Sequence, residues 1–341
     1  MRQSKNTDSP HGSHRFRRVL ALLLMLFFIT SACSSSPSFD TRTLKATLPG
    51  QQIWKDHTSS FLFGTNDTYE WATQNIQTEA SIQQALRSAG FTLIRSFFPD
   101  NAGDSVIEKR ISTIEQSGAH CLGVITNIFN PAFNQRLVRY LGNRCQMYEF
   151  GNESDYDGIS IETYLQQWNS QIPQLKRINP QAKFIGPVTY NETGKNDFMQ
   201  AFLQGVKQSG ILPDAISFHW YPCYQDSQQD CLNAASSAAQ ATGTVRDLIQ
   251  SILGRDLPIG ISEWNYDPGN PPPEYGDNAG FITAFTTSAL RSMAQAGVAF
   301  ACQFDAASFA GYGRLDMFNV SNDAPKPQYY AIKTLIQHYQ L

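Results

Sequence analysis

Two glutamates stand at the ends of apolar runs and could act together on one bond. Glu153 closes the segment Tyr-Glu-Phe-Gly-Asn-Glu, and Glu263 follows Gly-Ile-Ser and precedes Trp. Two carboxyl groups flanking one cleft can cleave a glycosidic bond, because one protonates the leaving oxygen while the other attacks or activates water. A separation of about 5 Å predicts retention of configuration, and a wider one predicts inversion. A glutamate considered alone is more often a surface or salt-bridged residue, so the surrounding elements must decide.

Short runs rich in apolar, β-branched and aromatic residues recur along the chain and predict strands. They cover 61–66, 91–97, 121–127, 147–152, 183–189, 215–221, 258–264 and 299–305. Longer stretches between them have helical periodicity, and several end at a glycine, which can adopt the left-handed conformation that terminates a helix. The clearest are 78–88, 107–117, 162–177, 197–208, 235–253 and 279–296.

Alternating strands and helices predict an α/β fold with a parallel sheet, and eight such units have the size of a closed (β/α)₈ TIM barrel. A doubly wound open sheet is the alternative, but no glycine-rich phosphate loop follows an early strand. Catalytic groups of such barrels project from the carboxyl ends of the strands. Glu153 ends the fourth predicted strand and Glu263 lies at the end of the seventh, so both would line one cleft.

These motifs resemble those of the clan A glycoside hydrolases, which are retaining enzymes with a (β/α)₈ barrel. Gly-Asn-Glu at 151–153 is similar to the acid/base motif of the clan, and Ser-Glu-Trp at 262–264 to its nucleophile motif. The resemblance runs from residue 61 to the end. Segments 148–153 and 216–221 look most like the family 79 β-glucuronidase and heparanase branch, with family 39 β-xylosidases and iduronidases and family 5 cellulases close behind.

The resemblance implies a retaining β-glycosidase with Glu153 as general acid/base and Glu263 as nucleophile. Glu153 would then be protonated near neutral pH and Glu263 ionised, and we expect the charge of Glu263 to raise the pKa of Glu153. A poly- or oligosaccharide is the expected substrate. No cofactor is implied, and the cysteines and histidines do not have the spacing of a zinc site.

Four further residues match positions that bind substrate in the clan. Asn152 would donate its amide to the sugar 2-hydroxyl, and Arg95 would orient the nucleophile. His219 would line the sugar site, and the hydroxyl of Tyr221 would bond the nucleophile. Asn152 could instead be a turn residue, and Arg95 could form a structural ion pair. For His219 and Tyr221 the alternative is packing in an aromatic core.

Three polar residues at or within the strands have less specific assignments. Asn127 and Asn66, at the ends of strands three and one, are candidates for sugar contacts, and a capping role is equally open for each. Period-2 alternation places Glu149 on the same face as Glu153 but four residues, or about 13 Å, deeper in the barrel. We expect it to be a buried polar residue of the core.

The clan commonly has a tryptophan at the end of strand eight as a sugar platform, whereas this chain has Phe-Asp-Ala at 304–306. Trp264, assigned to substrate binding, could supply the platform, and Trp220, Phe309 and Tyr312 are alternatives. The proline-rich loop 266–277 follows Glu263, and we expect it to shape the aglycone side.

The N-terminus has the order of a secretory signal: arginines, an apolar run from 19 to 29, and small residues. We predict a signal peptide over 1–32 and a lipid-attachment site, linker and lead-in over 33–60, followed by the catalytic barrel over 61–341. Cys33 resembles the lipidated cysteine of bacterial lipoproteins, although Thr30 stands where leucine is usual. The protein would be exported, either as a cell-envelope lipoprotein or as a secreted protein.

Export favours disulfide formation among the remaining cysteines. We predict Cys223 with Cys231 and Cys121 with Cys145, and we expect Cys302 to be a buried free thiol. The chain has a net charge of −3, which becomes −7 without residues 1–32, and no basic cluster follows Arg18. This argues against a nucleic-acid partner.

Two rival interpretations remain at the level of sequence. A barrel with the same cleft could bind sugar for adhesion or sensing without catalysis. Alternatively, both glutamates could be structural in a protein that acts on another small molecule. The sugar and linkage, endo or exo action, and the oligomeric state are left open by the sequence.

Overall fold

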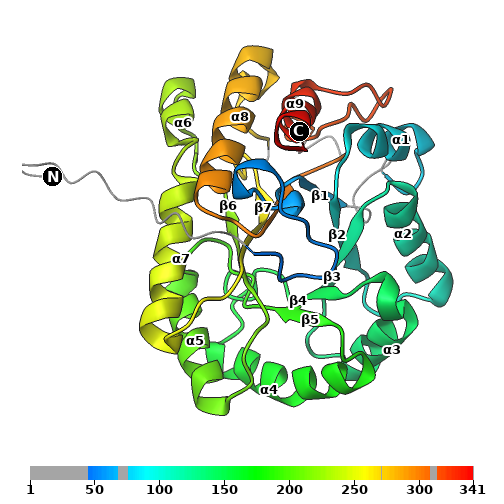
Figure 1. The fold of residues 1–341 in the computed structure, drawn as a ribbon, viewed down its shortest axis with the longest axis vertical. Coiled ribbons are helices and arrows are strands. Elements are labelled where there is room, and N and C mark those ends of the chain that lie inside the picture. The colour runs from blue at the N-terminus through cyan, green and yellow to red at the C-terminus, as the bar shows by residue number, and fades with distance from the viewer. Residues whose placement is uncertain (1–44, 68–75, 270, 308–312, 341) are drawn as a thin grey trace, which may run out of the picture. The chain divides into compact units, whose positions relative to one another are not determined.

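The computed structural model describes residues 45–67, 76–269, 271–307 and 313–340 (Figure 1). Eight parallel strands confirm the predicted barrel fold. They are β1 (Gly64–Asp67), β2 (Leu93–Phe98), β3 (His120–Ile125), β4 (Met147–Phe150), β5 (Lys183–Ile185), β6 (Ile216–Trp220), β7 (Ile259–Trp264) and β8 (Phe300–Gln303). The predicted signal peptide (1–32) and Cys33 lie outside the described residues.

The strands pair in the order β5-β4-β3-β2-β1-β8-β7-β6, so β1 lies between β2 and β8. Isolated parallel bridges join the two outer strands, Ile185 with Ala215 and Thr189 with Phe218, which leaves a nearly closed barrel. The predicted strand 183–189 is too long, because β5 ends two residues before Pro187. Proline has no backbone N–H to continue a ladder.

Helices surround the strands on the outside (Figure 1). They are α1 (Ala80–Ala89), α2 (Asp104–Gln116), α3 (Pro131–Leu141), α4 (Ile161–Ile178), α5 (Phe198–Ser209), α6 (Gln228–Ala234), α7 (Ala238–Leu253), α8 (Ala279–Gln295) and α9 (Pro327–Gln340), with 3₁₀ turns at Lys55–His57, Ser60–Leu62, Gly142–Arg144, Lys195–Asp197 and Glu274–Asp277. Left-handed Gly90 and Gly254 end α1 and α7 as expected. The single helix predicted over 235–253 is wrong at its start, because α7 begins at Ala238 and a separate α6 precedes it.

None of the helices in the described ranges is long and apolar enough to cross a membrane.

The barrel interior is apolar at the end where the strands begin. Leu93 of β2, Leu122 of β3, Met147 of β4 and Phe300 of β8 belong to one buried cluster there, and Leu48 packs into it. The lead-in segment is tied to this end, since Gln51 donates from Nε2 to the carbonyl oxygen of residue 299 at 3.2 Å. Leu48, Gln51 and Ser59 therefore anchor the lead-in segment to the barrel.

Both predicted disulfides are present. Cys121 is bonded to Cys145, at the starts of β3 and β4, and Cys223 is bonded to Cys231 across the segment that leads into α6. Cys302 on β8 is buried and has a free thiol, also as predicted.

Candidate active site

Glu153 lies in the loop that follows β4. The chain leaves the extended conformation after Phe150, with positive φ at Gly151 (90°) and at Glu153 itself (43°). The N–H of Glu153 donates to the carbonyl oxygen of Val188 at 2.9 Å, which ties this loop to the segment after β5. A left-handed backbone at a non-glycine residue is uncommon and is enriched at functional sites.

A bulge in β7 aims Glu263 into the barrel. Phe218 of β6 pairs with Ile261, but the next residue, His219, pairs with Glu263, so Ser262 has no partner on β6. An extra residue of this kind changes the direction of the side chains that follow it. Glu263 thereby shares the inward face with His219 and is only 7% exposed.

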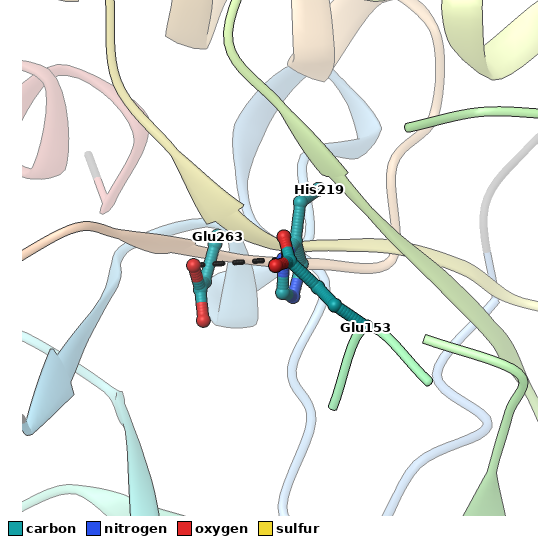
Figure 2. Close-up of side chains that lie close together, drawn as sticks. All are labelled: Glu153, His219 and Glu263. Carbon is teal, nitrogen blue, oxygen red and sulfur yellow. Dashed lines mark hydrogen bonds and ion pairs between the residues drawn. The ribbon is translucent and has the colours of Figure 1, made fainter. Parts of the chain in front are cut away.

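Glu153, His219 and Glu263 converge at the barrel mouth (Figure 2). One ligand atom from each of the three residues lies within 4.8 Å of the others. Nδ1 of His219 is 2.6 Å from Oε1 of Glu153 and 3.5 Å from Oε2 of Glu263. These atoms are close enough to bind one divalent cation or to share a proton.

The direction of the pKa shift of Glu153 differs from the expectation. Burial lowers the pKa of His219, but the charges of Glu263 and Glu153 raise it by more, so the net shift is upward. Burial raises the pKa of Glu153, but the charge and hydrogen bond of the His219 imidazolium lower it by more. The prediction that Glu263 raises the pKa of Glu153 is therefore wrong, because His219 contacts both carboxylates and dominates.

Arg95 of β2 is fully buried and is surrounded by oxygen acceptors. Its Nη1 donates to Oε1 of Glu263 at 2.5 Å and to Oδ1 of Asn66 at 2.9 Å. Its Nε donates to Oε2 of Glu149 at 2.5 Å, and its Nη2 donates to Oδ1 of Asn152 at 2.6 Å. Burial acts to lower the pKa of Arg95, but the two carboxylates raise it, so the guanidinium stays charged. It holds Glu263 and Asn152 in fixed orientations.

Tyr221 binds the other oxygen of Glu263. Its hydroxyl donates to Oε2 at 3.2 Å. Burial, reinforced by the charge of Glu263, raises the pKa of Tyr221 well above its usual value, so the hydroxyl keeps its proton. Glu263 is thus fixed by Arg95 on one oxygen and by Tyr221 on the other.

Glu149 is buried, as expected, and bridges Arg95 and Ser217, whose hydroxyl donates to Oε1 at 2.6 Å. The expected spacing of about 13 Å from Glu153 assumes an extended chain throughout. β4 stops at Phe150, so that assumption fails. Arg95 binds Glu149 directly and reaches the motif of Glu153 through Asn152.

Two predicted substrate-binding residues lie elsewhere. Trp264 is 1% exposed and pairs with Trp220 on β6, so it packs into the core outside the barrel instead of facing the cleft. Asn127 uses both ends of its amide locally: Nδ2 donates to Asp100 at 2.7 Å, and Oδ1 accepts from the N–H of Phe129 at 2.8 Å. Trp264 thus lies on the side of β7 opposite to Glu263, and Asn127 stabilises a loop with both ends of its amide.

Asn66 connects Arg95 to the backbone of β7. Its Nδ2 donates to the carbonyl oxygen of Ser262 at 3.0 Å, while its Oδ1 accepts from Arg95. The alternative platforms Phe309 and Tyr312 lie outside the described residues. Phe304 contacts the ring of Tyr221 with a centroid distance of 6.4 Å and lines the cleft.

A cavity of about 850 Å³ opens over Glu153 and Glu263. Besides the residues named above, side chains from the loops after β4, β5, β6 and β7 and from α7 line it. They include Tyr156, Tyr190, Glu192, Tyr224, Gln240, Thr244, Pro268 and Gly269. Sequence analysis did not single out the three tyrosines, although each closely follows the end of a predicted strand.

No protein-family model matches the sequence, and no curated protein matches it. Solved structures do match the fold: a glucosidase from Croceicoccus marinus is 19% identical with a TM-score of 0.65, and the match covers 81% of this chain and 67% of that one. An α-L-arabinofuranosidase from Thermotoga maritima is 14% identical with a TM-score of 0.63, covering 85% and 71% of the two chains.

A monomeric β-xylosidase from Caulobacter crescentus CB15 is 16% identical with a TM-score of 0.59. That match covers 76% of this chain and 64% of the xylosidase. The chain therefore spans about two thirds of the length of these enzymes. At such identities the likeness establishes the fold, and the barrel expected from the resemblance to clan A is confirmed.

Proposed function

We propose that the protein is an exported retaining glycoside hydrolase in which Glu263 is the nucleophile and Glu153 the general acid/base. The observation that carries this proposal is the close approach of the two carboxylates, with ligand atoms within 4.8 Å. Retaining enzymes have carboxyl groups about 5–5.5 Å apart, whereas inverting enzymes need about 6.5–9.5 Å. The similarity in fold to a glucosidase, a xylosidase and an arabinofuranosidase supports carbohydrate as the substrate.

In the first step, an oxygen of Glu263 bonds to the anomeric carbon while the bond to the leaving oxygen breaks. Glu153 donates a proton to that oxygen, so the leaving group departs as an alcohol. Nδ1 of His219 lies 2.6 Å from Oε1 of Glu153, and His219 supplies this proton to Glu153 through a single transfer. Arg95 and Tyr221 hold Glu263 in position for the attack.

In the second step, Glu153 removes a proton from water, the water oxygen bonds to the anomeric carbon, and the ester to Glu263 breaks. Two displacements restore the original configuration. Donation from Arg95 and Tyr221 stabilises the carboxylate as it departs. Each step thus uses a contact present at the site.

For export, we propose lipid attachment at Cys33 after removal of residues 1–32. The basic, apolar and small-residue order of the leader supports this. A Cys33→Ser variant should move from the membrane fraction to the soluble exported fraction. Retention of that variant in the membrane fraction would argue against the lipid anchor.

Hydrolysis of a panel of aryl β-glycosides tests the enzymatic proposal, with glucoside, xyloside, glucuronide, galactoside and cellobioside as substrates. The wild-type protein should turn over at least one of them. Glu263→Ala should lose this activity, and azide should restore it with inverted product. Equal rates in both proteins would refute Glu263 as nucleophile, and sugar binding without any turnover would favour the non-catalytic barrel.

A further inference from the structure

Part of the cavity wall lies beside Glu153, in the loops after β4 and β5. Its lining runs over the loops after β4, β5 and β6 to Gln240 and Thr244 of α7. A general acid must contact the leaving oxygen, so the leaving group of a substrate lies next to Glu153. If the proposed function holds, this part of the cavity receives the leaving group.

Two tyrosines form one wall of this region. The rings of Tyr156 and Tyr190 have centroids 5.8 Å apart, and both line the cavity. Tyr156 is 64% exposed, an unusual position for a large aromatic ring. Its N–H donates to the carbonyl oxygen of Glu153 at 2.9 Å, so the ring is connected to the proposed acid through one turn of chain.

A buried carboxylate fixes this wall. Asp155 is almost fully buried, and its two oxygens accept the backbone N–H groups of Tyr190 at 3.3 Å and Lys195 at 2.8 Å. These bonds clamp the loop after β4 to the loop after β5. The backbone segments that carry the two rings are therefore fixed relative to each other before a ligand arrives, which lowers the entropic cost of binding.

The rest of the lining is aromatic, polar or acidic. Tyr224 also lines the cavity and is 76% exposed. Glu153, Glu192 and Glu263 are the acidic residues of this lining, and His219, between Glu153 and Glu263, is its one basic residue. His219 is already paired with both catalytic carboxylates, so an anionic sugar would find no unpaired cation among these lining residues, whereas a neutral sugar can stack on aromatic faces and use the polar groups.

We propose that Tyr156 and Tyr190, together with Tyr224, form a leaving-group subsite for an uncharged sugar residue. The enzyme would accordingly cleave bonds within or between neutral glycans, with at least one sugar bound on each side of the scissile bond. This proposal rests on the proposed function for the direction of the substrate. It assigns a binding role to three tyrosines outside the catalytic group.

The test compares two kinds of substrate in a Tyr156→Ala/Tyr190→Ala double variant. Cellotetraose and xylotetraose have sugar leaving groups, whereas β-glucosyl and β-xylosyl fluoride release fluoride, which occupies no sugar subsite. We expect kcat/KM for the hydrolysed tetrasaccharide to fall about tenfold or more, as for loss of a well-buried aromatic contact. The value for the fluoride should stay within about twofold of wild type.

Tyr330→Ala is the matched control, because Tyr330 on α9 is 55% exposed and does not line the cavity. It should change neither value. An equal fall with both substrates, or no fall with the tetrasaccharide, would overturn the subsite.

Calorimetric binding of the same tetrasaccharides separates this proposal from the proposed function. If the wild-type protein hydrolyses nothing, the proposed function fails, and the subsite is judged by whether the double substitution weakens tetrasaccharide binding. Absence of binding by the wild type, or unchanged binding by the variant, would overturn it. Tetragalacturonate should bind more weakly than either neutral tetrasaccharide, and tighter binding would contradict the uncharged ligand.

Discussion

The two ends of the barrel interior use the same strands for opposite purposes. On β2, Leu93 belongs to the apolar cluster where the strands begin, and Arg95, two residues later on the same face, is the buried cation at the mouth. On β4, Met147 and Glu149 repeat this change. A step of two residues along a strand, about 7 Å, separates apolar packing from charge.

The two ends therefore contribute differently to the free energy of unfolding. At the end where the strands begin, apolar burial stabilises the fold by about 1.5–3 kcal/mol per large side chain. At the mouth, buried charges are unfavourable unless paired, and Arg95 satisfies two carboxylates at once. We infer that the charged end is maintained for its chemistry and is stabilised by the apolar end.

The largest expected effect is at the charged end, in the variant Glu153→Gln. With sugar leaving groups, loss of the general acid should reduce kcat/KM by about 10²–10⁴-fold. Glycosyl fluorides need no protonation and should retain most of their rate in the first step. Steady-state and pre-steady-state kinetics on both substrates would check this, and an equal loss on both would contradict the role of Glu153.

Matched substitutions on β2 compare the two ends directly. Arg95→Met leaves Glu149 and Glu263 without their cation and should destabilise the fold by about 3–5 kcal/mol, with loss of activity. Leu93→Ala should cost about 2–5 kcal/mol but leave kcat/KM of the folded protein unchanged. Urea unfolding would measure the stability of both variants, and kinetic assays their activity. Loss of activity in folded Leu93→Ala would contradict the separation of stability from activity between the two ends.

A third prediction concerns the disulfide at the apolar end. Replacing Cys121 and Cys145 by Ala opens a covalent loop with a sequence separation of 24 residues. We expect a loss of about 3 kcal/mol in unfolding free energy and an unchanged kcat/KM. A large fall in kcat/KM at a temperature where the variant is folded would show that the two ends are coupled.

The smallest effect should be a shift in pH dependence. The pKa of His219 is raised, so its proton is present below that value and kcat/KM should fall as the pH rises through it. His219→Asn removes the more basic of the two groups His219 and Glu153. The fall of kcat/KM at high pH should therefore begin at a lower pH in this variant. His120→Asn, on the first residue of β3 at the opposite end, is the control and should leave the profile unchanged. An unmoved limb in His219→Asn would mean that another group carries the proton.

Much of the fold could be predicted because its signals are local. Each strand has an apolar run, and Gly90 and Gly254 follow the helices that they end. The helix α3 was not singled out, although Asn130 as a cap and Pro131 at the first turn are a start signal. The short helix α6 was not singled out either, and it lies entirely before the predicted stretch 235–253.

The site was less predictable, because its details depend on contacts between strands. The motifs placed Glu153 and Glu263 at the barrel mouth, but the bulge at Ser262, which directs Glu263 inward and Trp264 to the opposite side, has no sequence signal. The position of His219 between the carboxylates likewise depends on the pairing of β6 with β7. Strand alternation alone could not provide either feature.

Trapping of the glycosyl–enzyme intermediate tests the central claim most directly. The protein would be incubated with a 2-deoxy-2-fluoro-β-glycosyl fluoride of the preferred sugar, digested and analysed by mass spectrometry. The account predicts one added fluorosugar on the peptide that contains Glu263, and none in Glu263→Gln. A label on another residue, or active hydrolysis with inverted product and no label, would contradict it.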